Sequence, residues 1–336
     1  MTLEATAPEQ VELVADAQTE PSRGIWLRVL LRLLSALSVL WGAATLAFIS
    51  VRLAPGDTVD VLLGEQQRTP EVEAAIRAEW GLDSPVVVQY FRYLWHSAHG
   101  DFGRSYVLQQ PVSDILRSQA GPTLELTAAA LLVALIFAVV VATTTAQRRR
   151  SRALANTVEL ALVSTPTFWL GIVLLSVFSF NLKIFPVSGN KGAAALVLPA
   201  LTLGLSLGAV ISQVLRDGLE RALEEPFALT VKSWSVSESA LRLRHGLRHA
   251  ALPAVTLTGW LVGGLLGGAV ITEAVFGRPG LGRLTVNAVL AQDLPVVLAV
   301  AILSALVYVV ISTIVDLLYL WLDPRLRTGS REGRSR

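Results

Sequence analysis

The chain has 336 residues, of which 53% are hydrophobic and only 16% are charged, and its formal net charge is +2. Soluble domains carry about 25% charged residues, so this composition excludes an ordinary soluble protein and indicates several membrane spans. The small positive charge does not indicate a nucleic-acid partner, because the basic residues gather at the ends of apolar runs. Without cysteine, the chain holds no disulfide and no thiolate metal site.

Residues 1–24 are acidic and polar without a sustained apolar face, so we expect a disordered tail. This segment lacks the basic start and short apolar core of a signal peptide. Residues 25–51 form the first apolar run, which is long enough to cross about 30 Å of hydrocarbon. Arg28 and Arg32 at its start place that end on the cytoplasmic side.

The polar region 52–119 contains more acidic than basic residues, which suits the extracytoplasmic side. Thr69 is placed to N-cap a helix that has Pro70 at its first position, and Gly81 is placed to end it. The run VVVQYFRYLWH (86–96) is rich in aromatic residues. It predicts either a segment at the membrane interface or the core face of a small external helical domain.

Residues 120–327 contain five further apolar runs and form the expected transmembrane domain. Backbone polar groups in lipid must be satisfied within helices, so the sequence predicts an all-α membrane protein with six transmembrane helices. The expected spans are 25–51, 123–146, 155–182, 194–215, 251–276 and 296–322. Residues 284–295 are expected to form a loop or a re-entrant or interfacial helix.

Basic clusters set the predicted orientation, and the strongest is Arg148-Arg149-Arg150-Ser151-Arg152. With this cluster inside the cell, both termini, including the tail 328–336, are cytoplasmic. The polar stretch 216–250 between the fourth and fifth spans then faces the cytoplasm, where we expect it to lie in water and meet a partner.

Two patterns near the fifth span have more than one interpretation. Gly259, Gly263 and Gly267 are four residues apart, which predicts close helix packing either within the chain or at a subunit interface. His245 and His249 have a spacing compatible with a metal site, but arginines crowd them and no carboxylate lies between them. A basic helix face near lipid headgroups is the favoured interpretation, and we expect no metal site.

Ionisable residues inside spans are functional candidates by default. Here they are few and lie near span ends, where structural hydrogen bonds are the alternative role: Glu125, Glu159, Glu273 and Asp316. Together with polar residues of the fourth span they give the predicted lining of a pathway for a polar solute: Glu125, Thr202, Ser206, Gln213 and Glu273. The sequence shows no catalytic constellation, no P-loop and no chain of buried acids, which disfavours an enzyme and a self-sufficient secondary transporter.

The chain resembles the membrane permease subunits of binding-protein-dependent ABC importers of the dipeptide, oligopeptide and nickel group. The resemblance covers about residues 25–327 and rests on motifs that occur in the family's order. They are RLAPGD (52–57), GLDSPVVVQY (81–90), GDFGRS (100–105), PTLELT (122–127), STPTFWLGIVLL (164–175), FPVSG (185–189), LRHAALPAV (247–255), GGAVITEAVFGRPGLGRL (267–284), QDLPVV (292–297) and DLLYLWLDPRLR (316–327).

The resemblance implies a type I permease fold whose stretch between helices 4 and 5 forms coupling helices that dock on a separate ATPase. Pro226, Thr230, Ser237 and Glu238 match the family pattern in place, and Lys232 keeps its positive charge. Ser235 replaces a glycine and Trp234 a common lysine. The contact residues that the resemblance implies are Glu225, Pro226, Phe227, Thr230, Lys232, Trp234, Ser235, Ser237 and Glu238.

The resemblance also implies a location in the plasma membrane and a set of partners that lie in this membrane or next to it. They are a second, related permease subunit, two ATP-binding subunits that carry ATP and Mg, and an extracytoplasmic solute-binding protein. The chain itself then binds no cofactor and hydrolyses no ATP. Di- or oligopeptides are the expected solute, with nickel, a metal chelate or another small solute as the alternative, and a heterodimer of permeases is favoured over a homodimer.

Overall fold

The computed structural model describes residues 22–53, 58–63, 69–79, 81, 83–190, 192–234 and 236–322. The described part is helical, and an isolated bridge between Arg104 and Pro111 is its one extended pairing. Residues 1–21 and 323–336 lie outside the described residues, and they include most of the expected tail 1–24 and all of the expected tail 328–336. The prediction of an all-α protein is confirmed.

Four helices of the described chain contain an apolar stretch long enough to cross a membrane. They are α1 (Ser22–Leu53), α5 (Val112–Thr145), α8 (Ala194–Glu224) and α13 (Leu294–Leu322). Two bent pairs bring the number of candidate spans to six if each pair is counted as one span. The first combines α6 (Arg149–Ser164) with α7 (Thr167–Leu174) and the π-helix η2 (Leu175–Asn181). The second runs through α10 (Glu238–Ala240), η3 (Leu241–Gly246) and α11 (Leu247–Val275) and bends by 52° within α11, between Leu265 and Gly267.

The third span differs from the continuous helix expected over 155–182. Its two halves meet at 105°, at Thr165 and Pro166. Thr165 has extended backbone angles (φ −83°, ψ 125°), because the ring of a following proline disfavours the helical conformation. The second span differs at its start, since α5 begins at Val112 and the expected boundary at 119/120 falls inside a helix.

Helices α5 and α8 form the closest pair in the core. Ala130, Ala134, Ala138 and Ala142 lie four residues apart on α5 and are all fully buried. Gly204 of α8 faces Ala130 so closely that an added Cβ would lie 2.6 Å from that residue's carbonyl oxygen. Small residues at this spacing let two helix backbones approach, so α5 and α8 pack as one unit along most of their length.

The region after α1 contains α2 (Thr58–Leu63), α3 (Pro70–Glu79) and α4 (Val86–Ala98). Thr69 Oγ1 accepts a hydrogen bond from the amide of Val72 (3.3 Å), and Gly81 has a φ of +62°, as predicted for the two ends of α3. Among the aromatic residues of α4, Tyr93 stacks on Phe48 of α1. Others, such as Trp95, are exposed, so each of the two predicted roles fits part of this helix.

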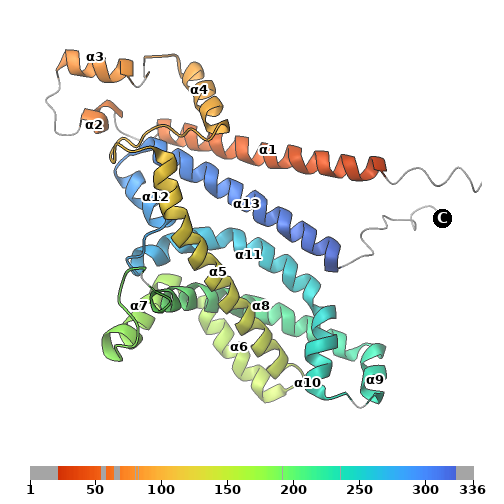
Figure 1. The fold of residues 1–336 in the computed structure, drawn as a ribbon. Coiled ribbons are helices and arrows are strands. Elements are labelled where there is room, and N and C mark those ends of the chain that lie inside the picture. Colours follow the sequence, from red (N-terminus) through yellow and green to blue (C-terminus); the bar gives the residue numbers. More distant parts are fainter. Residues whose placement is uncertain are drawn as a thin grey trace, which may run out of the picture.

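Figure 1 shows that the bundle has two ends. The start of α1, the end of α13 and the short helices α9 (Pro226–Ser233) and α10 lie toward one side of the view. Helices α4 and α12 (Leu281–Leu290) lie toward the opposite side. The expected loop or re-entrant piece at 284–295 is therefore largely helical, because α12 covers its first half. The side of the bundle that holds α9 and α10 is called the α9 end below, and the side that holds α4 and α12 is called the α12 end.

Candidate functional site

The polar stretch between the fourth and fifth spans folds into short helices. Helix α8 continues to Glu224, and α9 starts at once with Pro226 in its first turn. Glu225 is extended (φ −70°, ψ 152°), as expected of a residue that precedes proline. Ser237 caps α10 by accepting a hydrogen bond from the amide of Ala240 (3.3 Å). Residues 225–234 and 236–246 are called the α9–η3 segment, and Ser235 lies outside the described residues.

One face of the α9–η3 segment belongs to the protein core. Val231 of α9 and Leu241 of η3 are buried in the same cluster as Leu219 and Leu223 of α8, and Ala228 of α9 is also buried. Burying apolar side chains stabilises this contact by about 25 cal/mol for each Å² removed from water. The segment is therefore fixed on the end of α8 and moves with it.

The aromatic ring of Phe227 strengthens this attachment. It stacks on the ring of His249 at the start of α11, with 4.3 Å between ring centres and 18° between ring planes. His249 is nevertheless exposed, so its place on a basic helix face near lipid headgroups stays a prediction. In the described part of the chain, no group of three metal-ligating side chains exists.

The opposite face of α9 is open. Leu229 is 72% exposed and Trp234 is 66% exposed. Between them lie the exposed side chains of Thr230 and Lys232. A large aromatic ring and a leucine held out from a rigid short helix are typical of a protein-binding surface, in which aromatic anchors carry much of the affinity.

Charged residues tie the two parts of the segment together. The Glu238 carboxylate lies 3.8 Å from Nζ of Lys232 and accepts a hydrogen bond from Nη2 of Arg242 (3.1 Å). Arg242 is 7% exposed, and its Nη1 donates to the carbonyl oxygen of Thr143 near the end of α5 (3.4 Å). Sequence reasoning treated Arg242 only as a charge beside the histidines. The i, i+4 spacing of Glu238 and Arg242 was the available signal.

The structure also corrects the start of the polar stretch, because Arg216 lies in the core rather than in water. It is 2% exposed and forms a bidentate pair with the fully buried Glu159, with Nη–Oε distances of 2.9 and 2.7 Å. Arg216 also donates to Asn156 Oδ1 (2.7 Å), and Ser212 donates to Glu159 (2.6 Å). Glu159 is thus a structural residue that joins α6 to α8.

The predicted pathway residues do not share one surface. Glu125 is exposed and pairs with Arg278 (3.1 Å). Thr202 is buried and donates to the carbonyl oxygen of Leu198 (2.8 Å), while Ser206 and Gln213 are half-buried. Glu273 is fully buried. In this conformation Thr202 and Glu273 are covered by the chain's own helices, and a role for them in the pathway stays a prediction. The side chain of Asp316 lies outside the described part.

The glycines of α11 have different surroundings. Gly259 lies against Val315 and Gly263 against Tyr308, both on α13, and an added Cβ at either would come within 3 Å of these side chains. Close packing within the chain is therefore confirmed for these two glycines. Gly264 and Gly267 have nothing within 4 Å of such a Cβ, so the subunit-interface interpretation stays a prediction for that side of the helix.

Fold and site together define a polytopic helical membrane protein that presents a rigid, partly apolar segment at one end of its bundle. The family model described as "Binding-protein-dependent transport system inner membrane component" matches residues 112–328. A second model, described as "Binding-prot-dependent transport system membrane comp, N-term", matches residues 26–127. The chain belongs to this family, and it is a permease subunit of an ABC importer.

Curated relatives match along nearly the whole chain. The "Glutathione transport system permease protein GsiC" of Salmonella paratyphi A (strain ATCC 9150 / SARB42) is 38% identical over 302 residues, which cover 89% of this chain and 98% of that protein. The protein of the same name from Escherichia coli (strain K12) is 36% identical over the same coverage. The resemblance found from the sequence motifs is confirmed.

Proposed function

We propose that the α9–η3 segment is the element through which separate ATP-binding subunits drive this permease. The observation that carries the proposal is that α9 is buried on one face and exposed on the other. On its inner face Ala228 is buried and Val231 joins the core cluster of α5, α8 and α11, whereas Trp234 at its end is exposed. A partner that moves the exposed face therefore also moves the helices behind it, as a rigid-body switch requires.

The arginine cluster 148–152 supports a cytoplasmic position for the α9 end. It lies beside the end of α8, where Arg152 pairs with Glu220 (2.5 Å) and Glu220 accepts from the amide of Gln147 (3.2 Å). Basic residues of short loops stay on the cytoplasmic side. The α9–η3 segment then faces the compartment that contains ATP, and the α12 end faces the extracytoplasmic binding protein.

Short peptides are the proposed solute. The relatives are named for glutathione transport, and glutathione is itself a short peptide. We further propose that the chain pairs with a second, related permease subunit, and that an extracytoplasmic solute-binding protein delivers the peptide and selects it. Identifying the solute that co-purifies with that binding protein tests the substrate class. A nickel ion or a metal chelate in place of a peptide would refute this part of the proposal.

The coupling role is tested by replacing Glu225, Thr230 and Trp234 with alanine in the assembled importer. We expect weaker binding of the ATP-binding subunits, lower ATP hydrolysis and lower transport, while the purified subunit stays folded. Trp95→Ala is a matched control, because Trp95 is also about two-thirds exposed (67%) but lies on α4 at the other end. If the triple variant binds the ATP-binding subunits as well as Trp95→Ala does, the coupling assignment is wrong.

A further inference from the structure

The segment that joins α11 to α13 at the α12 end is held by buried polar contacts. Thr123 of α5 donates a hydrogen bond to Glu273 Oε1 (2.6 Å) and accepts one from the amide of Leu281 (2.8 Å). The other carboxylate oxygen of Glu273 accepts from the amide of Arg283 (3.0 Å). Thr123 and Glu273 are almost fully buried. The start of α12 is therefore fixed to both α5 and α11.

A second pair repeats this connection between α5 and the joining segment. Arg278, 1% exposed, donates from Nη2 to Glu125 (3.1 Å), while its Nε and Nη1 have no partner in the described structure. Thr123, Glu125, Glu273 and Arg278 are together called the α12 latch. A buried guanidinium group that is only partly paired is less stable than a fully paired one. The contact between Arg278 and Glu125 is therefore a weak point in the connection between α5 and the joining segment.

The far end of the joining segment is also attached. Asp293, just before α13, accepts hydrogen bonds from the hydroxyl of Ser105 and from the amide of Tyr106 (3.0 Å for the amide). This contact holds α12 against the chain that leads into α5. Since α12 is tied at both ends, its movement requires the latch to open.

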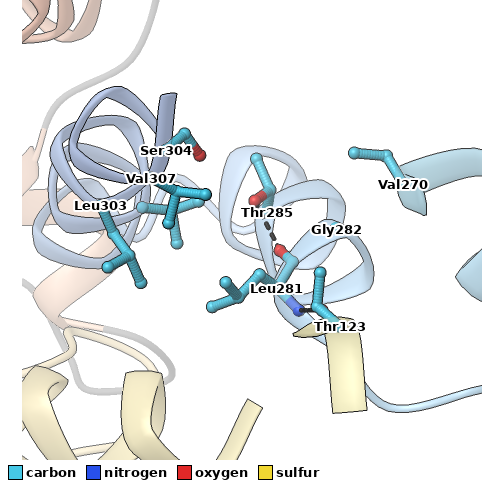
Figure 2. A pocket seen from close by; sticks show the side chains of 9 residues that line it. Thr123, Val270, Leu281, Gly282, Thr285, Leu303, Ser304 and Val307 are labelled. Atoms are coloured by element: carbon cyan, nitrogen blue, oxygen red, sulfur yellow. Dashed lines mark hydrogen bonds between the residues drawn. The ribbon is translucent and has the colours of Figure 1, made fainter. Parts of the chain in front are cut away.

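A small cavity beside the latch leaves room for such a movement. Figure 2 shows Thr123, Thr285 and Ser304 around it, contributed by α5, α12 and α13. Its volume is about 40 Å³, whereas protein interiors are otherwise close-packed. The interface between α12 and α13 is therefore incompletely filled where the latch lies.

The same helix that holds the latch also holds the α9–η3 segment. Thr123 and Glu125 lie in the first half of α5, and near its end the carbonyl oxygen of Thr143 accepts a hydrogen bond from Arg242 (3.4 Å). The rise of an α-helix places Thr123 and Thr143 about 30 Å apart. Between them, α5 is one continuous helix whose buried alanines pack on α8.

We propose that α12 is the outer gate of the permease and that the α9–η3 segment opens it by displacing α5, with Arg242 as the positioning residue between them. The proposal rests on the coupling role given above to the α9 end. Displacing α5 along or about its axis separates Thr123 and Glu125 from Glu273 and Arg278 and frees the start of α12. Two-state packing of this kind converts a small shift at one end into opening at the other.

The test uses a cysteine reporter, because the chain has no cysteine of its own. Ser304→Cys, in the wall of the cavity, is treated with a membrane-impermeant maleimide in the assembled importer. Labelling is compared without nucleotide and with ATP held on hydrolysis-deficient ATP-binding subunits. We expect a rise of about tenfold or more with ATP, because an open state populated at about 10% or less becomes the main one.

Variants of the chain separate the two parts of the proposal. Thr123→Val and, independently, Glu273→Gln are expected to raise labelling without nucleotide, since each weakens the latch. Arg242→Met is expected to remove the ATP-dependent rise while the ATP-binding subunits still bind. Arg248→Met is the matched control and keeps the rise, because Arg248 is an exposed arginine at the start of α11, outside the α9–η3 segment. Binding of the ATP-binding subunits and a monodisperse elution profile identify variants that are folded.

Two results overturn the proposal and leave the coupling role intact. Equal labelling of Ser304→Cys in both nucleotide states, in an importer that transports, shows that α12 is not a gate. A full ATP-dependent rise in folded Arg242→Met shows that Arg242 does not transmit the movement. Loss of partner binding in the Glu225, Thr230 and Trp234 alanine variant is measured separately, so failure of one proposal is distinguishable from failure of the other.

Discussion

Replacing Glu159 with glutamine is expected to destabilise the permease far more than replacing Arg152, a partly exposed residue of the same helix, with methionine. The mutation leaves the guanidinium of Arg216, 2% exposed, without its counter-charge. Removing one member of a buried pair costs about 3–5 kcal/mol, because the remaining charge stays desolvated. Hydrogen bonds in membranes are individually worth only about 0.6 kcal/mol on average, so we expect a value near the lower limit, about 3 kcal/mol.

The surroundings of the pair define a compensating variant. In Glu159→Leu combined with Arg216→Met, both charges leave together, and apolar replacement of a buried pair is often neutral. Ser212 keeps its second hydrogen bond, to the carbonyl oxygen of Ala209 (2.9 Å). We therefore expect the double variant to lie within about 1.5 kcal/mol of the parent.

The measurement is denaturant unfolding in mixed micelles, followed by the fluorescence of the eight tryptophans. Arg152→Met is the comparison, because Arg152 is 42% exposed and its partners Asp217 and Glu220 are 53% and 16% exposed, and pairs of this solvent-accessible kind contribute about 0–1 kcal/mol each. The reasoning fails if Glu159→Gln is no less stable than Arg152→Met. It also fails if the double variant is as unstable as the sum of its two single changes.

Three smaller predictions follow from other contacts. Gly208→Ala places a methyl group 2.8 Å from the carbonyl oxygen of Ala134 and should destabilise the α5–α8 pair by about 1–3 kcal/mol, whereas Gly264→Ala, with open space around it, should leave unfolding unchanged. Burial raises the pKa of Tyr93 to about 12, against about 10 when unfolded. The stability that the protonated hydroxyl of Tyr93 contributes is therefore complete below pH 10 and is lost as the pH rises from about 10 to 12. The Tyr93→Phe variant should lose less stability than the parent over this pH range. Equal losses of stability in the variant and the parent would count against the assignment. Thr69→Ala should lower helicity of α3 and stability by about 0.5–2 kcal/mol through loss of its cap, seen by circular dichroism and thermal unfolding.

The sequence predicted the membrane class and the number of spans because lipid imposes a length and polarity rule on every spanning helix. It predicted the ends of α3 for a similarly local reason, since Thr69, Pro70 and Gly81 act on their own neighbours. The short helices of the polar stretch followed from the family pattern, and the structure places Pro226 at the start of α9 and Ser237 at the N-cap of α10. Trp234, which departs from that pattern, is exposed, and its role as an anchor for a partner stays a prediction.

Partners far apart in the chain were not predictable in this way. Glu159 and Arg216 were both noticed from the sequence, one as a candidate for the pathway and the other as the start of a solvated stretch, but nothing local shows that they pair with each other. The same holds for Glu273, whose partners come from α5 and from the turn before α12. The bend at Pro166 was missed because the hydrophobicity of an apolar run does not indicate the angle between the two helices that it forms.

The sequence by itself therefore determined that this chain is a polytopic helical permease and where the polar stretch after α8 begins to fold, because hydrophobicity, proline and capping residues act over one helical turn or one span. Only the tertiary structure decided which charges are buried, which face of α9 is open, and that α5 contacts both the α9–η3 segment and the α12 latch. Those outcomes depend on how α5, α8 and α11 pack, and packing joins residues that the chain order separates.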